Sequence, residues 1–148
     1  MELLKQNDKR LRLKSEEVLS LEEAKSIGHY LTSRFNELDG KVLGLAAPQF
    51  GILKRVVLIR KNGKPDIVVN PKIKFTLLGR RKSMEGCEST GGKKNQYIVS
   101  RPNLALVTWM DVTGKKHCRL YGYKKMRVFE HEVDHLNGIL IDKGVKVC

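Results

Sequence analysis

Apolar residues recur at spacings of three and four in two segments, one near each end of the chain. The first segment contains Ala24, Ile27, Leu31 and Phe35, and the second contains Met126, Phe129, Val133 and Leu136. This spacing gathers apolar side chains on one face of a helix, so we predict two amphipathic helices with buried faces. Ser20 and Glu23 indicate a capping box at the start of the first helix, and Asn137-Gly138 supplies a stop for the second.

Between these helices the pattern changes to short apolar runs separated by glycine, proline and asparagine. The strand-like runs cover residues 55–60, 66–70, 73–78, 96–100, 104–112 and 117–121. Strands in the middle of a chain with helices at both ends are typical of an α+β fold, and not of an alternating parallel sheet. We therefore expect antiparallel or mixed sheets packed around a C-terminal helix.

The composition fits one compact unit. A hydrophobic fraction of 41% over 148 residues is enough for one core, and no linker divides the chain, so we predict a single domain over residues 1–148. No apolar run of about 18 residues and no secretory signal is present, which argues against a membrane or secreted protein. Three cysteines, an odd number, do not indicate a disulfide framework, and we expect a monomer in the cytoplasm.

The chain is strongly basic, with a formal net charge of +13. Such a charge can mark contact with RNA, because cations gain affinity by displacing counterions from phosphates. Here the cations are scattered, from Lys5 to Lys146, and no aromatic-rich RNA-binding motif accompanies them. We predict no specific nucleic-acid binding, and at most a weak general attraction to the ribosome.

The second predicted helix contains the pattern His131-Glu132-Val133-Asp134-His135. Two imidazoles four residues apart lie on the same face of a helix and can hold one metal ion. Glu132 stands where its carboxylate can reach a water molecule activated by that ion and move its protons. The pattern indicates a metal-dependent hydrolase. The alternative is a surface helix that carries two histidines by chance, since five residues alone are not specific.

A third metal ligand must come from the N-terminal side of this pattern. Metalloproteases with a third histidine six residues after the second would need it at Ile141, and no acidic residue follows Asp142. The upstream candidates are His29, His117, Cys118 and Cys87. Cys87 stands apart because it lies in a polar, glycine-containing segment between two strand-like regions. We expect His29 to be a surface residue and Cys118 a buried strand residue.

Three segments together resemble the motifs of the peptide deformylase family, in the family's order. They are Gly44-Leu45-Ala46-Ala47-Pro48-Gln49, Glu85-Gly86-Cys87-Glu88-Ser89 and His131-Glu132-Val133-Asp134-His135-Leu136-Asn137-Gly138. The resemblance covers nearly the whole chain. It implies a hydrolase that removes the N-formyl group from the N-terminal formylmethionine of nascent peptides and releases formate.

The resemblance also implies roles for individual residues. Cys87, His131 and His135 would be the metal ligands, and Glu132 the acid and base. The side-chain amide of Gln49 and the backbone N–H of Glu88 would donate hydrogen bonds to the formyl oxygen. The residues implied to bind substrate are Leu43, Gly44, Glu85, Gly86 and Val128, of which Leu43 and Val128 would line a pocket for the methionine side chain.

The implied cofactor is one divalent metal ion. A site of one thiolate and two imidazoles suits iron(II), zinc, nickel or cobalt, and affinity alone does not select among them. The resemblance favours iron(II). Because ferrous iron and a metal thiolate are both open to oxidation, a purified sample could contain zinc or another replacement.

The chain departs from the family pattern in several places. Val42 occupies the first glycine of the usual Gly-x-Gly, so we expect an altered turn and a narrower cleft. Glu88 replaces a leucine of many bacterial members, which changes the rim of the site more than its mechanism. Residues 89–95 are expected to form a mobile loop. The chain ends ten residues after Gly138, without the long C-terminal helix that resembles a ribosome-docking element, as in phage-encoded and some other short members.

Three hypotheses follow. A deformylase would release formate from formyl peptides and lose activity with Cys87→Ala. A different metal-dependent amidase or peptidase with the same ligands would cut ordinary peptides. A nucleic-acid-binding module with a structural metal would have a closed fourth coordination position and no hydrolysis. Glu132 and Gln49 have no task in the third hypothesis.

Overall fold

The computed structural model describes residues 1–38 and 41–147, and within them two α-helices flank one sheet. The helices are α1 (Leu21–Glu37) and α2 (Tyr123–Leu136). The strands are β1 (Gly44–Ala46), β2 (Val56–Lys61), β3 (Lys64–Cys87), β4 (Gly92–Met110), β5 (Lys116–Gly122) and β6 (Val145–Lys146). Short 3-10 turns cover Lys9–Arg12, Ala47–Phe50, Glu88–Thr90 and Ile141–Lys143.

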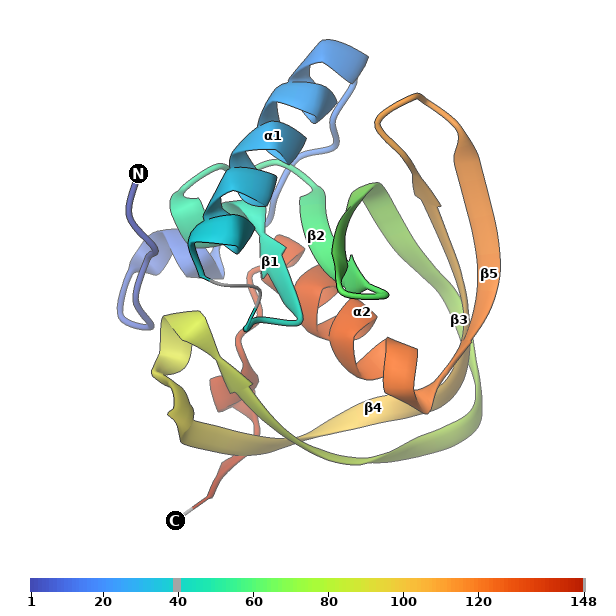
Figure 1. Cartoon of the computed structure of the whole chain (residues 1–148). Helices are drawn as coiled ribbons and strands as arrows, with labels where there is room; N and C mark the ends of the chain where they lie inside the picture. Colours follow the sequence, from blue (N-terminus) through green and yellow to red (C-terminus); the bar gives the residue numbers. More distant parts are fainter. Residues whose placement is uncertain (39–40, 148) are drawn as a thin grey trace.

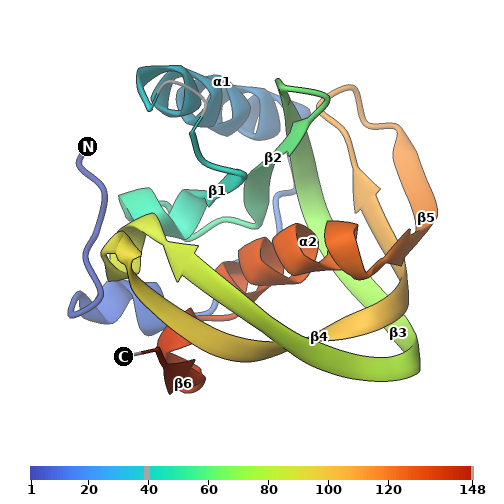
Figure 2. The ribbon, with the colours of Figure 1, turned by 60° about the horizontal axis from the view of Figure 1, so that its bottom comes forward.

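The sheet is antiparallel and winds around α2. Its order is β1-β2-β3-β4-β5, and β6 pairs with the first part of β4. Figures 1 and 2 show the long strands β3 and β4 curving past α2, which lies between them and the β1–β2 part of the sheet. Register shifts between β3 and β4 supply this curvature, because extra residues in one strand bend it. The predicted α+β class, with sheet packed around a C-terminal helix, is confirmed.

Each helix covers one face of the sheet through alternate strand residues. Leu45, Val56 and Leu58 belong to the core cluster with α1, whereas their neighbours Ala46 and Val57 belong to the cluster with α2. This alternation follows from the two-residue period of a strand. It places β1 and β2 in the centre of the molecule, with apolar contacts on both faces.

Both predicted helices are confirmed. The Ser20 hydroxyl caps α1 by accepting a hydrogen bond from the Glu23 backbone N–H at 3.4 Å. The apolar stripe of α2 is buried, with Met126, Phe129, Val133 and Leu136 all in the core. None of the described helices combines the length and apolar character needed to cross a lipid bilayer.

The prediction of separate strands was wrong in two places. Residues 66–70 and 73–78 are parts of β3, and residues 96–100 and 104–112 contribute to a single strand, β4, that runs to Met110. Asn70 and Leu78 have positive φ angles of 49° and 60°, close to two of the register shifts. The breaks in the apolar pattern are therefore bulges in continuous strands, and the hydrogen-bonded ladder resumes after each one.

The expectation that residues 89–95 form a loop was also wrong. The turn Glu88–Thr90 leads directly into β4, which begins at Gly92. The Thr90 hydroxyl donates to the Cys87 carbonyl at 3.1 Å, and the Asn95 side-chain amide donates to the Thr90 carbonyl at 3.0 Å. These bonds satisfy polar groups within the turn and connect it to both strands, so its polar composition does not produce an irregular loop.

Candidate metal centre

Helix α2 brings two histidines and a glutamate to one place in the interior. The rings of His131 and His135 lie one helical turn apart, with centroids separated by 5.3 Å. The apolar stripe of α2 fixes the rotation of the helix, and this rotation directs the two imidazoles toward the end of β3. His135 and Glu132 are almost completely buried, at 2% and 4% exposure.

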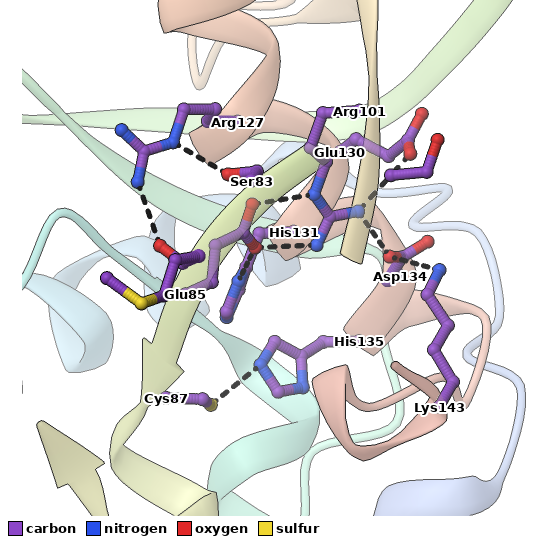
Figure 3. A network of polar contacts seen from close by, with 12 residues as sticks. Ser83, Glu85, Cys87, Arg101, Arg127, Glu130, His131, Asp134, His135 and Lys143 are labelled. Atoms are coloured by element: carbon purple, nitrogen blue, oxygen red, sulfur yellow. Dashed lines mark hydrogen bonds and ion pairs between the residues drawn. The ribbon is translucent and has the colours of Figure 1, made fainter. Parts of the chain in front are cut away.

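Cys87 completes a three-residue cluster from a distant part of the sequence. It is the last residue of β3, next to the register shift between Gly86 and Cys87. The Cys87 Sγ lies 3.3 Å from the His135 Nε2, as Figure 3 shows. The ligand atoms of Cys87, His131 and His135 all lie within 4.8 Å of one another. The fold therefore brings the end of β3 next to the two histidines of α2, a proximity that the sequence alone indicated only through the family resemblance.

The three groups fit a metal ion. With bond lengths of about 2.0–2.3 Å, ligand atoms on a tetrahedral ion stand roughly 3.5 Å apart. The Cys87 Sγ and the His135 Nε2 are 3.3 Å apart, and all three ligand atoms lie within 4.8 Å of one another. Burial raises the pKa of the Cys87 thiol, but the adjacent His135 and His131 imidazoles outweigh it and hold that pKa well below its usual value. The cysteine is thus disposed to be a thiolate, which is the form that binds metal.

Glu85 orients His131. Its Oε1 lies 2.9 Å from the His131 Nδ1, which leaves the Nε2 of that ring for an ion. Burial opposes the charge of Glu85, but hydrogen bonds from His131 and Arg101 lower its pKa to about 2. A carboxylate that fixes the tautomer of a metal-binding histidine also raises the basicity of the ring. Glu85 was expected to bind substrate; its carboxylate contacts His131 and Arg101, and the residue also lines the cleft.

Arg101 is the centre of an ion-pair network that sequence reasoning missed. The side chain is 0% exposed, and it donates to Glu85 at 2.7 and 2.9 Å, to Glu130 at 3.2 Å and to Asp134 at 2.7 Å. Figure 3 shows this guanidinium between the sheet and α2. Asp134, whose role the sequence left open, also accepts from Lys143 at 3.1 Å. The sequence offered only the four-residue spacing of Glu130 and Asp134 as a signal.

Glu132 lies beside the three candidate ligands, in an enclosed position next to Gly44 of β1. A Cβ at Gly44 would stand 2.7 Å from the Glu132 Oε1, so only glycine leaves room for this carboxylate. Among the described residues, the Glu132 Oε2 has no hydrogen-bond partner. Burial raises the pKa of Glu132. A carboxylate with a raised pKa and an unpartnered oxygen is suited to accept and release a proton.

Gln49 is held so that its amide N–H groups point toward the cluster. Its Oε1 accepts from the Ala46 backbone N–H at 2.8 Å, which fixes the orientation of the side chain. Its Nε2 lies 3.2 Å from the Ser89 Oγ and 3.6 Å from the Cys87 Sγ. The side chain is 2% exposed. A buried amide donor therefore stands next to the candidate ligands.

A cleft of about 290 Å³ opens onto this centre. Its lining includes the expected substrate residues Leu43, Gly44, Glu85, Gly86 and Val128, together with Gln49 and Glu88. Val42 also lines the cleft and packs against the core cluster under α1, and it does not have a positive φ angle. Valine at this position is thus accommodated by ordinary backbone geometry.

The other candidate ligands lie elsewhere. His29 is exposed on α1, as expected. His117 stacks on Trp109 with ring centroids 5.0 Å apart, and its Nε2 lies 2.8 Å from the Asp111 Oδ2. The expectation that Cys118 is buried was wrong, because it is exposed on β5. Strand β5 is the last strand in the order β1-β2-β3-β4-β5 of the sheet. Within it, Cys118 lies on the face opposite to that of His117 and Tyr121.

The comparisons with known proteins agree with this geometry. The family model described as polypeptide deformylase matches residues 1–147. The chain belongs to the polypeptide deformylase family. It is 36% identical to the peptide deformylase of Finegoldia magna over 139 residues, which covers 91% of this chain and 83% of that relative.

Solved deformylase structures have the same fold. A probable peptide deformylase from Synechococcus phage S-SSM7 is 33% identical, with a TM-score of 0.86 and coverage of 97% of this chain and 98% of that one. The peptide deformylase from Synechococcus elongatus in complex with actinonin is 30% identical, with a TM-score of 0.87 and coverage of 97% and 78%. The deformylase family is metal-dependent, and the Cys87, His131 and His135 cluster is the part of this chain suited to hold the ion.

Proposed function

We propose that this chain removes the formyl group from the N-terminal formylmethionine of nascent peptides in the cytoplasm and releases formate. The observation that supports it most directly is the convergence of Cys87, His131 and His135 beside Glu132, within 4.8 Å for the three ligand groups. The family membership of the chain selects deformylation over another amidase or peptidase reaction. We also propose that residues 1–148 act as one monomeric catalytic domain.

In the proposed site, Cys87, His131 and His135 hold one divalent metal ion, which we propose is iron(II) in the cell. When bound, such an ion supplies a Lewis acid that lowers the pKa of a coordinated water molecule to near neutrality. Glu85, supported by Arg101, keeps the His131 ring in the orientation for binding. Zinc, nickel or cobalt suits the same ligands and could replace iron in a purified sample.

The proton transfers are assigned to Glu132. Its carboxylate accepts a proton from the attacking water and then donates it to the nitrogen of the departing amine, which leaves formate and a free amino terminus. The raised pKa of Glu132 favours this exchange, because the protonated form persists closer to neutral pH. One carboxyl group serves both steps.

Stabilisation of the formyl oxygen is assigned to Gln49 and Glu88. The Gln49 amide is oriented by the Ala46 backbone N–H, so its own N–H groups face the centre. The backbone N–H of Glu88 is the second proposed donor, beside Cys87 in the chain. Preorganised donors of this kind lower the barrier because they stabilise the charge that grows on the oxygen.

Substrate binding is assigned to the cleft. Leu43 and Val128 are proposed to contact the methionine side chain, and Gly44, Glu85 and Gly86 to lie along the substrate near its backbone. A weak attraction to the ribosome surface is proposed from the net charge of +13 alone.

The deciding experiment is a formate-release assay on formyl-Met-Ala-Ser, with iron-loaded protein kept free of oxygen. The proposed function predicts turnover of this peptide and no cleavage of unformylated Met-Ala-Ser. Cys87→Ala should abolish turnover and lower the bound metal measured by atomic emission. Cleavage of the unformylated peptide, with formyl-Met-Ala-Ser left intact, would instead establish the second hypothesis, a different metal-dependent peptidase.

A further inference from the structure

The cleft that opens onto the candidate metal centre is lined by basic side chains on several sides. They are Lys41, Lys93, Lys124 and Arg127. They come from the segment before β1, from the start of β4 and from α2. Four cations around one cleft of about 290 Å³ are more than a pocket for an apolar methionine side chain requires.

Arg127 is fixed at the wall of this cleft by neutral partners. Figure 3 shows Arg127 beside Ser83, to whose Oγ its Nε donates at 2.9 Å. A terminal nitrogen of Arg127 donates to the Met84 carbonyl at 3.2 Å. Among residues 1–38 and 41–147, no ion pair includes Arg127, Lys93 or Lys124. The positive charge of these three side chains is therefore not neutralised within the described part of the chain.

The carboxylates of the cleft do not balance these cations. Glu85 forms an ion pair with Arg101 and a hydrogen bond with His131, and Glu132 is 4% exposed beside the candidate ligands. Among the lining residues that the structure describes, Glu88 is the one remaining acidic group, and it is half-buried near Gly92. The cleft thus presents an excess of positive charge to whatever enters it.

The spacing along α2 indicates which part of a peptide meets this charge. Arg127 and Lys124 precede His131 by four and seven residues, which corresponds to about 6 and 10 Å along the helix axis. An extended peptide advances by roughly 3.3 Å per residue. A formyl peptide that ran from the metal centre along α2 toward Lys124 would bring the side chains of its second and third residues within reach of these cations.

We propose that the cleft selects formylated peptides with an aspartate or glutamate at the second or third residue. This inference rests on the proposed function and adds a substrate preference to it. Basic grooves also attract RNA, but here the cations surround the same cleft as the candidate metal ligands, where a substrate has to bind. Acidic peptides are therefore favoured as the occupant.

The test compares kcat/KM for formyl-Met-Ala-Ser with four peptides that carry Asp or Lys at the second or third residue. Surface charge pairs change binding by about twofold to fivefold each, so we expect acidic peptides to exceed their lysine counterparts by at least that factor. The ratio should fall at about 0.5 M NaCl, because salt screens exposed charges. An acidic-to-basic ratio near one at low salt would overturn the preference.

Lys124→Glu should lower the acidic-to-basic ratio, and Lys125→Glu is the matched control. Lys125→Glu changes the net charge by the same amount on the same helix. The Nζ of Lys125, however, lies 4.9 Å from the centre of the Tyr121 ring, and Lys125 does not line the cleft. Equal acidic-to-basic ratios in the two variants would overturn the proposal. It would also be overturned if the wild-type ratio were one and an oligoribonucleotide inhibited the turnover of every peptide equally, because the cleft would then bind RNA and not acidic peptides. Turnover of neutral formyl-Met-Ala-Ser tests the proposed function separately, because it does not depend on this preference.

Discussion

The two helices bury similar apolar stripes against opposite faces of one sheet, but they differ in their polar sides. On α1 the charged residues remain exposed, as Glu22 and Lys25 do. On α2 part of the polar side is buried as well, namely Glu130, Glu132 and His135. Charged groups are seldom buried without partners, because desolvation disfavours them. The difference indicates that the polar side of α2 is buried for chemistry, since packing alone requires only its apolar stripe.

Arginine pairing shows the same contrast. Arg34 and Glu37 form a 2.6 Å pair on α1 with side chains 31% and 55% exposed. Arg101 is completely buried beneath α2 and contacts three carboxylates. A surface pair contributes little, whereas breaking a buried pair leaves a charge without compensation. We therefore expect the Arg34–Glu37 pair to be dispensable for the fold. The Arg101 network, in contrast, holds the ring of His131 through Glu85.

The largest expected effect is on the polar side of α2. Glu132→Gln keeps the shape of the side chain but removes its ability to accept a proton, so kcat should fall by about 10²–10⁴-fold. The measurement is steady-state formate release by metal-loaded protein. Glu22→Gln makes the same substitution on the exposed side of α1, and its kcat should equal that of the wild type. Retained activity in Glu132→Gln would remove this residue from the mechanism.

The second prediction concerns the network under α2. Arg101→Met should lower the free energy of unfolding by about 3–5 kcal/mol, because buried carboxylates lose their shared partner. It should also weaken metal binding by about 10–100-fold, since Glu85 would no longer be held against His131. Urea unfolding and competition with a chelator measure the two effects. The control is Arg34→Met on α1, which should change stability by at most about 1 kcal/mol. Similar losses in both variants would contradict the contrast between the two helices.

The third prediction concerns the apolar stripe of α1. Leu31 is fully buried in the cluster that α1 forms with β1 and β2. Leu31→Ala should cost about 2–5 kcal/mol of unfolding free energy through lost contacts and a cavity. Below the unfolding temperature, kcat should be retained, because α1 supplies no group to the metal centre. A fall in kcat without unfolding would show that α1 positions the site after all.

Local patterns predicted the elements that depend on local physics. The period of three and four identified both helices, and the two histidines followed from helix geometry. Local context singled out Cys87 among the upstream candidates, but its role as a metal ligand came from resemblance, because its approach to His135 joins positions 48 residues apart. For Arg101 the only signal was the four-residue spacing of Glu130 and Asp134, since its partners lie 16 to 33 residues away on other elements.

The wrong predictions have a common physical cause. Alternation along β5 shows that Cys118 and His117 face opposite ways, but it does not say which face of an edge strand is covered. The breaks in the apolar pattern near Asn70 and Leu78 resemble turns in the sequence. In the structure they are bulges, because the strand remains paired with β4 on both sides of each break. In each case the outcome depends on what packs against the strand, and this information is not local to the sequence.

The smallest effect is expected at the start of α1. The Ser20 hydroxyl accepts from the Glu23 backbone N–H at 3.4 Å, which satisfies one of the free donors at the helix end. Ser20→Ala should lower the free energy of unfolding by about 0.5–2 kcal/mol, while Ser20→Asp, which restores an acceptor, should recover most of it. Urea unfolding measures the stability of the two variants. Because α1 supplies no residue to the candidate metal cluster, kcat and metal affinity should stay at wild-type values. A change in either would show that the start of α1 influences the metal centre.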